Sequence, residues 1–276
     1  MIQEIDVSFM ITHHRRSIVG LAFCLFTIIA AGLAQTAAKD EAVWKDFLQW
    51  LAAQPPNSRP MDLISPYRED LLRRGVPPAE ADRRLALVSD LAFHSPEGAK
   101  ALWNKVYAGK NPIFVPTPTA LVVQAIAGRR PGKALDYGIG QGRNSVFLAM
   151  SGWDVTGFDP SDEGVRIAQE NASKSGVKIH TVVTTDDQFE FGKDQWDLIV
   201  VTYVRLLDKA DADKLWSALK PGGIVVYENG AIGANALLRA FLRYRIVRFE
   251  NVETTAEWNQ GQKARVERLI AEKALD

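Results

Sequence analysis

The stretch "ALDYGIGQGRNS" carries three glycines at alternate positions, Gly138, Gly140 and Gly142, directly after an apolar segment. A glycine turn that follows a β-strand lets a nucleotide-like ligand approach the backbone closely. The dinucleotide fingerprint G-x-G-x-x-G places its third glycine at position 143, where this chain has Arg143. Arg143 disfavours NAD and FAD, because the third glycine allows close helix–strand packing. The phosphate-binding pattern G-x-x-x-x-G-K-[ST] is absent from the sequence, which disfavours ATP and GTP.

Carboxylates follow the glycine turn at the ends of two later apolar segments. Asp159, in "GFDPS", lies about 20 residues after the first glycine, the reach of an acid that accepts hydrogen bonds from ribose hydroxyls. Asp186 or Asp187, in "TTDDQF", could accept a hydrogen bond from an adenine amino group. Together these residues indicate a ligand that contains adenosine and needs no phosphate-binding lysine.

Apolar and helical segments alternate from about residue 112 onward, and this alternation must position the acids. Strands are predicted at 133–138, 153–159, 177–184, 195–204 and 224–230, with helices at 117–128, 143–152, 161–176 and 209–223. Strands that alternate with helices at this spacing form a doubly wound parallel sheet with helices on both faces. Ligands bind at the carboxyl ends of such strands, where the strand order reverses. A helix at 234–242 and a strand at 244–252 follow, whereas periodicity leaves 264–273 open between helix and strand.

A helical appendage, residues 39–111, precedes this α/β domain, which covers residues 112–276. Helices are predicted at 39–54, 78–93 and 95–109, where apolar residues recur at helical spacing or prolines mark helix starts. Trp44, Trp50 and Trp103 of the appendage are interpreted as core residues, with a lid over the substrate as the alternative.

Residues 1–38 have the composition of a secretory signal peptide or an N-terminal membrane anchor. Arg15 and Arg16 precede an uncharged apolar run from Ile18 to Ala34, and polar residues follow at once. We therefore expect a protein that is exported, to the periplasm or the extracellular space, or tethered to the membrane by this segment. Basic residues before the run favour an N-terminus inside the cell and hence a domain outside it.

Charge and cysteine content narrow the class of partner. The chain has 33 Lys and Arg against 33 Asp and Glu, and no dense basic run follows residue 16, which disfavours nucleic acid. The only cysteine, Cys24, lies inside the predicted leader, so the rest of the chain is expected to have no disulfide, thiolate metal site or cysteine nucleophile. No metal site is predicted. A small-molecule substrate is the expected partner, and the oligomeric state stays open.

Residues 112–273 resemble class I S-adenosylmethionine-dependent methyltransferases. The likeness rests on the motifs "LDYGIGQGRNSVFLAMSGWDVTGFDPS", "WDLIVVTY" and "LKPGGIVVYE", which occur in the family's order. The "GxGRN" of the first motif is most similar to the small-molecule branch of that family. The resemblance implies a Rossmann-like, mostly parallel seven-stranded sheet with an antiparallel final strand, and hence a strand at 264–273. It implies S-adenosyl-L-methionine as cofactor and a small molecule as methyl acceptor, and it does not extend to the leader or the appendage.

The resemblance also assigns residues to parts of the cofactor. It implies that Asp136 and the three glycines contact the methionine end and that Asp159 binds the ribose. It implies that Asp186, rather than its neighbour Asp187, binds the adenine, with Asp187 as the alternative. Arg143, at the start of the following helix, either pairs with the methionine carboxylate or is a plain surface residue.

The implied reaction is an in-line displacement at the sulfonium methyl, in which positioning and exclusion of water supply much of the acceleration. Thr202 and Tyr203 match family positions that face the methyl group and the substrate. A general base is needed only for a hydroxyl or a protonated amine, and the candidates are Tyr203, Glu228, His180 and His94. We interpret His180, in a strand, as structural and His94, at a helix end, as a cap or surface residue.

Two other functions stay open at this point. A binding module could keep the cofactor pocket without methyl transfer, and a nucleotide-dependent oxidoreductase could use the same general fold. Arg143 argues against the oxidoreductase. No residue type in the sequence selects the acceptor or its nucleophilic atom.

Overall fold

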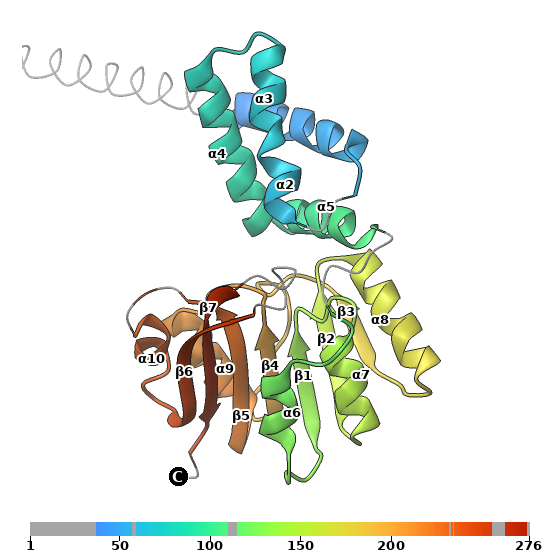
Figure 1. Ribbon diagram of the computed structural model, residues 1–276, viewed down its shortest axis with the longest axis vertical. Coiled ribbons are helices and arrows are strands. Elements are labelled where there is room, and N and C mark those ends of the chain that lie inside the picture. The colour runs from blue at the N-terminus through green and yellow to red at the C-terminus, as the bar shows by residue number, and fades with distance from the viewer. Residues whose placement is uncertain are drawn as a thin grey trace, which may run out of the picture.

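The computed structural model describes residues 37–56, 59–109, 115–231, 233, 235–255 and 263–274. Figure 1 shows a bundle of helices above an α/β unit that is built on one sheet. Residues 1–36, nearly all of the predicted leader, lie outside the described residues. Among the helices that are described, none combines the length and the apolar character needed to cross a membrane.

The bundle contains the helices up to Tyr107. Residues 37–53 are helical, and α2 (Pro60–Ile64), α3 (Pro66–Arg73), α4 (Pro78–His94) and α5 (Pro96–Tyr107) follow. The helices predicted at 39–54, 78–93 and 95–109 are confirmed, whereas α2 and α3 are additional. Both of these short helices begin at a proline, a residue that suits the first helical position but is equally common in loops. Phe47, Tyr67 and Leu102 are fully buried at the centre of the bundle.

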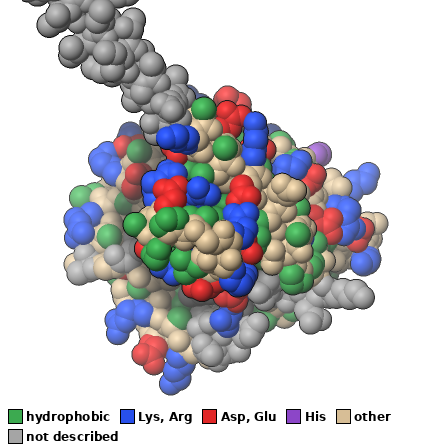
Figure 2. Space-filling model, turned by 90° about the horizontal axis from the view of Figure 1, so that it is seen from above, with side chains coloured by type: hydrophobic (Ala, Val, Ile, Leu, Met, Phe, Trp, Pro, Cys, Tyr) green, Lys and Arg blue, Asp and Glu red, His purple; other side chains and the backbone are tan. Residues whose placement is uncertain are grey.

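The outer face of the bundle carries acidic and basic side chains intermixed (Figure 2). Arg83 lies 2.8 Å from the carboxylate of Asp40, and Arg74 lies 2.6 Å from that of Asp46. Exposed ion pairs of this kind each contribute little to stability. The stability of the bundle therefore depends mainly on the side chains buried in its apolar core.

One seven-stranded sheet forms the α/β unit. Its strands are β1 (Lys133–Tyr137), β2 (Asp154–Asp159), β3 (His180–Val183), β4 (Trp196–Thr202), β5 (Leu219–Gly230), β6 (Arg245–Thr255) and β7 (Lys263–Glu272), in the order β3-β2-β1-β4-β5-β7-β6. Strands β1 to β5 pair in parallel, and β7 is antiparallel to both β5 and β6. The predicted doubly wound sheet with an antiparallel final strand is confirmed.

The segment that periodicity leaves open, 264–273, is β7. Most of this strand from Val266 onward is buried, including consecutive residues such as Leu269 and Ile270, which point to opposite faces of the sheet. A strand covered on both faces shows no alternation of apolar and polar residues. This is why its sequence pattern does not distinguish strand from helix.

Side chains of the sheet pack into two apolar cores on its opposite faces. In β4, Leu198 and Val200 pack with residues of α6 (Ala120–Ile126) and α7 (Arg143–Met150). Ile199 and Val201 pack with residues of α9 (Lys209–Ala218) and α10 (Ala236–Ala240). Helix α8 (Asp162–Lys174) follows β2 and contacts it and β3. In a sheet that carries helices on both faces, ligands bind at the carboxyl ends of the strands.

The strand order reverses at β1, which lies between β2 and β4. From β1 the chain passes to β2 and β3 on one side and then crosses back to β4 and β5 on the other. The loops after β1 and β4 therefore diverge, and such a reversal point is where ligands bind in open α/β sheets. Helix α5 of the bundle lies above these strand ends and contacts α8 (Figure 1).

Candidate functional site

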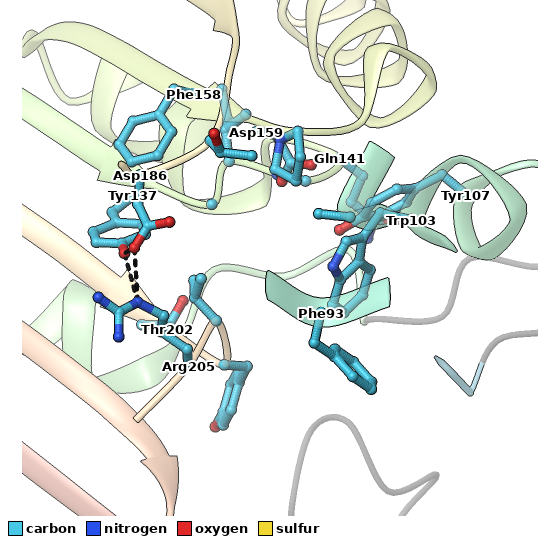
Figure 3. Close-up of a pocket in the computed structure, with 18 of the residues that line it drawn as sticks. Phe93, Trp103, Tyr107, Tyr137, Gln141, Phe158, Asp159, Asp186, Thr202 and Arg205 are labelled. Atoms are coloured by element: carbon cyan, nitrogen blue, oxygen red, sulfur yellow. Dashed lines mark hydrogen bonds and ion pairs between the residues drawn. The ribbon is translucent and has the colours of Figure 1, made fainter. Parts of the chain in front are cut away.

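A cavity of about 700 Å³ lies at the carboxyl ends of the strands, beneath α4 and α5. This size is within the usual range for small-molecule sites. The predicted residues that line it are His94, Gly138, Gly140, Arg143, Asp159, Asp186, Asp187, Thr202 and Tyr203. The predicted residues that do not line it are Asp136, Gly142, Glu228 and His180. Figure 3 shows the sheet side of the cavity, with Asp159, Asp186 and Thr202, facing Trp103 and Tyr107 of α5.

The glycine turn requires glycine for two separate reasons. Gly140 and Gly142 have φ of +49° and +79°, in the left-handed region that residues with a Cβ rarely adopt. In addition, a Cβ on Gly140 would lie 2.4 Å from the hydroxyl of Tyr107, and one on Gly142 would lie 2.8 Å from Cβ of Ala168. The turn thus combines a backbone conformation with close packing against α5 and α8.

The N–H groups of this turn point into the protein. Gly138 and Ile139 both donate to the carbonyl oxygen of Phe158, at 3.0 and 2.9 Å. Gly140 donates to Oδ2 of Asp159 at 2.9 Å, and Gly142 donates to the carbonyl of Ile139 at 2.8 Å. A phosphate-binding loop instead directs its N–H groups at the ligand. These four N–H groups are therefore not available to bind a phosphate.

Two buried carboxylates lie beneath and beside the turn. Asp159 is 5% exposed, and its Oδ1 accepts the N–H of Ser161 at 2.9 Å. Asp136 is 2% exposed and accepts the hydroxyl of Ser145 at 2.7 Å. Burial raises the pKa of each acid to about 6, against the lowering effect of these hydrogen bonds. Both are ionised at neutral pH, so this part of the site attracts a ligand that carries positive charge.

The expected adenine side of the cavity contains Thr185, Asp186 and Asp187. Oδ2 of Asp186 accepts the hydroxyl of Tyr137 at 2.5 Å and Nε of Arg205 at 2.8 Å (Figure 3). Burial alone would raise the pKa of Asp186, but the Tyr137 hydrogen bond and the Arg205 charge lower it overall. The hydroxyl of Thr185 is buried and, within the described part of the chain, has no partner. An orphaned hydroxyl that lines a cavity is available to a ligand.

Arg205 is a residue that the sequence analysis missed. Its guanidinium bonds Tyr137, Asp186 and Asp211, and it lines the cavity. It lies only a few residues beyond the end of β4, so extending the search from strand ends into the following loops would have found it. Its three partners lie at the end of β1, in the loop after β3 and in α9, so its contacts depend on how these segments fold together.

The end of β4 presents Thr202 and Tyr203 to the cavity. Oγ1 of Thr202 accepts Nδ2 of Asn144 at 3.0 Å. Tyr203 has φ of +58°, an unusual conformation for a residue with a bulky side chain, and its N–H donates to the carbonyl of Glu228 at 2.8 Å. The guanidinium of Arg143 lies 5.5 Å from the centre of the Tyr203 ring. Strain of this kind is retained where the surrounding structure fixes the residue.

Glu228 lies behind Tyr203 and outside the cavity lining. It is 1% exposed, accepts the hydroxyl of Tyr203, and lies 2.8 Å from Nε of Arg268 in β7. The arginine compensates the buried charge of the carboxylate. Any contact between Glu228 and a ligand would therefore pass through the hydroxyl of Tyr203.

The bundle contributes Phe93, Trp103 and Tyr107 to the cavity. Trp44 and Trp50 instead pack in the core of the bundle, where Trp44 stacks on Phe47 with ring centres 5.6 Å apart. The sequence identified the tryptophans but could not separate these two environments, because helical spacing does not reveal which face meets the sheet.

The two histidines proposed as base candidates differ in position. His94 lies at the edge of the cavity, and its Nδ1 is 2.9 Å from Oδ1 of Asp90 in the same helix. His180 begins β3, at the end of the sheet opposite the cavity, and its side chain is 76% exposed.

Replacement of Asp136 by asparagine tests the electrostatic description of the site. The raised pKa means that the folded protein holds the Asp136 proton at pH 5, where the unfolded chain has released it. The carboxyl therefore reduces stability as pH rises from about 4 to 6, by up to about 3 kcal/mol. We expect the stability of Asp136→Asn relative to the natural protein to increase from pH 4.5 to pH 7.5, as measured by urea unfolding.

Asp162→Asn provides the matched control with the opposite sign. Lys100, 3.0 Å away, lowers the pKa of Asp162, so this acid stabilises the fold above its unfolded pKa and loses that contribution on acidification. The relative stability of Asp162→Asn should therefore be nearly constant from pH 4.5 to pH 7.5 and should increase only below about pH 4, the unfolded pKa of an aspartate. A relative stability of Asp136→Asn that is constant or falls over the same interval would contradict the described environment of Asp136.

Parts of this chain are similar in sequence to known proteins. The family described as "Tellurite resistance protein TehB" matches residues 107–225. The chain is 35% identical over 83 residues to a probable S-adenosyl-L-methionine-dependent methyltransferase TehB of Haemophilus influenzae, a match that covers 30% of this chain and 29% of that protein. It is 35% identical over 112 residues to a ubiquinone biosynthesis O-methyltransferase of Bordetella pertussis, covering 38% of this chain and 46% of that protein. The chain thus spans less than half of the length of either relative.

A solved structure supports the fold. The structure titled "Conversion of a Disulfide Bond into a Thioacetal Group during Echinomycin Biosynthesis" superposes with a TM-score of 0.52 and 18% identity, over 63% of this chain and 93% of that one. At this identity the likeness concerns the fold alone. Sequence matches and strand order agree: residues 107–225 are related to the class I S-adenosylmethionine-dependent methyltransferases, and the sheet has the Rossmann-like fold of those enzymes.

Proposed function

We propose that this protein is a methyltransferase that uses S-adenosyl-L-methionine and acts on a small-molecule acceptor. One observation carries the proposal: the glycine turn directs its N–H groups inward and lies beside the ionised, buried Asp159. Such a site disfavours a phosphate and favours a ligand that combines ribose hydroxyls with positive charge. The family match over residues 107–225 supports the same conclusion.

The chain's own residues fit each part of this cofactor. Asp159 would accept hydrogen bonds from the ribose hydroxyls, and its charge, with that of Asp136, would attract the ammonium and sulfonium groups. Asp186, Asp187 and the unpartnered hydroxyl of Thr185 would surround the adenine. When bound, S-adenosylmethionine supplies a methyl group that is already activated by its positive sulfur. The remaining task of the protein is to align the acceptor and exclude water.

We also propose that the acceptor is a hydroxyl compound of small size, in keeping with the "GxGRN" motif that resembles the small-molecule branch. Tyr203 and Glu228 form a hydrogen-bonded pair whose tyrosine lines the cavity. A hydroxyl must lose its proton as it is methylated, and this pair would receive it through Tyr203. Phe93, Trp103 and Leu206 give the acceptor side of the cavity an apolar surface. The name of the Bordetella relative likewise specifies O-methylation.

The cofactor assignment is tested by calorimetry on Asp159→Ala. We expect the natural protein to bind S-adenosylmethionine and S-adenosylhomocysteine but not NADH. The variant should lose at least about tenfold in affinity for both, because the ribose hydroxyls lose a charged acceptor.

Asp154→Ala, at the opposite end of the same strand, is the matched control and should bind as the natural protein does. Binding of NADH alone would contradict the proposed function. Equal affinity of Asp159→Ala and the natural protein would eliminate the ribose role while leaving cofactor binding intact.

The proton-accepting pair is tested with Tyr203→Phe and Glu228→Gln on a panel of phenols and catechols, with methyl transfer followed by a labelled donor. With any acceptor that turns over, both variants should lower kcat at least about tenfold, since general base catalysis usually contributes more than that. The affinity for S-adenosylhomocysteine should be unchanged.

Tyr244→Phe removes a buried hydroxyl that bonds the carbonyl of Ala212, far from the proposed acceptor site, and serves as control. Full activity of Tyr203→Phe would exclude the pair as the route for the proton. Transfer confined to thiols or amines would exclude the hydroxyl acceptor.

For residues 1–38 we propose export or membrane tethering, which carries the α/β unit out of the cytoplasm. The apolar run from Ile18 to Ala34 behind paired arginines supports this proposal. Since S-adenosylmethionine is made in the cytoplasm, an exported enzyme would also need a supply of its cofactor.

A fusion of residues 1–38 to a reporter that is active only outside the cytoplasm tests the location. We expect activity from this fusion and none from a fusion that begins at residue 39. A full-length, inactive reporter in the cytoplasm would refute both export and an outward-facing anchor.

A further inference from the structure

Tyr107, the last residue of α5, brings the helical bundle into contact with the glycine turn. A Cβ placed on Gly140 would lie 2.4 Å from the Tyr107 hydroxyl, and one placed on Gly164, in the first turn of α8, would lie 3.0 Å from its ring. The side chain thus lies between the turn after β1 and the start of α8. Its hydroxyl points to the part of the turn that lines the cavity (Figure 3).

Helix α5 is held in this position by polar contacts with the start of α8. Oδ1 of Asn104 accepts the hydroxyl of Ser161 at 2.7 Å, and Nδ2 of Asn104 donates to Asp162 at 2.5 Å. Lys100, one turn earlier in α5, lies 3.0 Å from the other oxygen of Asp162. The ring of Trp103 packs beside that of Tyr107, with centres 6.1 Å apart. The position of Tyr107 is therefore fixed by neighbours on both sides.

The Tyr107 hydroxyl is a donor without a partner among the described residues. Its oxygen makes no hydrogen bond in the described part of the chain, whereas the hydroxyls of Tyr67 and Tyr137 donate to Asp46 and Asp186. Burial and the neighbouring Asp159 carboxylate raise the pKa of Tyr107 well above its usual value, so the hydroxyl keeps its proton at neutral pH. A neutral phenol that is held beside a cavity can donate one hydrogen bond to a ligand.

The amino-acid end of the proposed cofactor carries a carboxylate that needs such donors. The N–H groups of Gly138, Ile139, Gly140 and Gly142 are engaged within the protein. The cavity-lining amide of Asn144 is engaged at both ends, by the N–H of Thr119 at 2.9 Å and by Thr202 at 3.0 Å. Nη2 of Arg143 donates to Thr119 at 2.9 Å. The carboxylate therefore meets few uncommitted donors from the sheet side of the site.

We propose that Tyr107 is a cofactor-binding residue whose hydroxyl donates to the carboxylate of S-adenosylmethionine, so that the helical bundle completes the cofactor site. The inference rests on the proposed function and extends it. Its basis is the placement of an unpartnered hydroxyl at Gly140, on a helix fixed to the start of α8. The bundle thereby contributes to binding of the methyl donor as well as to the apolar lining of the acceptor side of the cavity.

The test compares two ligands that differ in a single group. S-adenosylmethionine carries the carboxylate, and decarboxylated S-adenosylmethionine keeps the adenosine, the sulfonium and the amine without it. Tyr107→Phe should weaken binding of the first by at least about tenfold and change binding of the second by less than about twofold, because a hydrogen bond to a charged group is lost only for the first. Affinities are measured by calorimetry on the full chain.

Tyr67→Phe is the matched control, since it removes a hydroxyl that donates to Asp46 in the core of the bundle. It should leave both affinities unchanged, and thermal unfolding verifies that both variants are folded. Equal losses for the two ligands in Tyr107→Phe would mean that the hydroxyl contacts the adenosine portion and would overturn the inference. Unchanged affinities would overturn it as well, with the proposed function intact. Failure of the natural protein to bind either ligand would overturn both.

Discussion

The carboxylate of Asp159 holds together the segments on which the whole site depends. One of its oxygens accepts the N–H of Gly140 in the turn after β1, and the other accepts the N–H of Ser161 at the start of α8. The hydroxyl of Ser161 then bonds Asn104 of α5, which extends the network into the helical bundle. A buried carboxylate is costly unless hydrogen bonds compensate it. The bond to Asp159 turns the N–H of Gly140 away from the ligand, as bonds to backbone carbonyls do for Gly138, Ile139 and Gly142, and this orientation separates the site from a phosphate cradle.

The acids around the cavity differ in what balances their charge. Asp186 and Glu228 each face an arginine, Arg205 and Arg268 respectively. Asp159 is held by neutral N–H donors alone, so its negative charge is left for a ligand. Positive charge on the ligand is therefore favoured at the end of β2, and much less so at the ends of β3 and β5. These three acidic side chains thus perform different tasks because of their neighbours, and their residue type alone does not distinguish them.

Features that depend on spacing along the chain were predictable, and features that depend on which surfaces meet were not. The strand ends of β1, β2 and β4 follow from alternation and from the positions of glycine and aspartate, so Gly138, Gly140, Asp159 and Thr202 fall at the cavity as expected. Tyr107 and Arg205 were missed, because no local pattern shows that the end of α5 meets the glycine turn or that β1, α9 and the loop after β3 each bond one guanidinium. Glu228 was placed at the correct strand end, yet its side chain turns behind Tyr203 toward Arg268. The position of a residue in the backbone can be inferred from the recurrence of apolar residues along the sequence, whereas the direction of its side chain depends on packing.

The place of β7 between β5 and β6 has a consequence for how the chain acquires its structure. Strands β1 to β5 pair with one another and can assemble as they leave the ribosome. Strand β6 pairs only with β7, which follows it in the chain, so it has no partner in the sheet until β7 has been synthesised. Arg268 of β7 also brings the positive charge for Glu228. The wall of the cavity at Tyr203 can therefore reach its final electrostatic environment only once β7, near the C-terminal end of the sheet's sequence, has taken its place in the sheet.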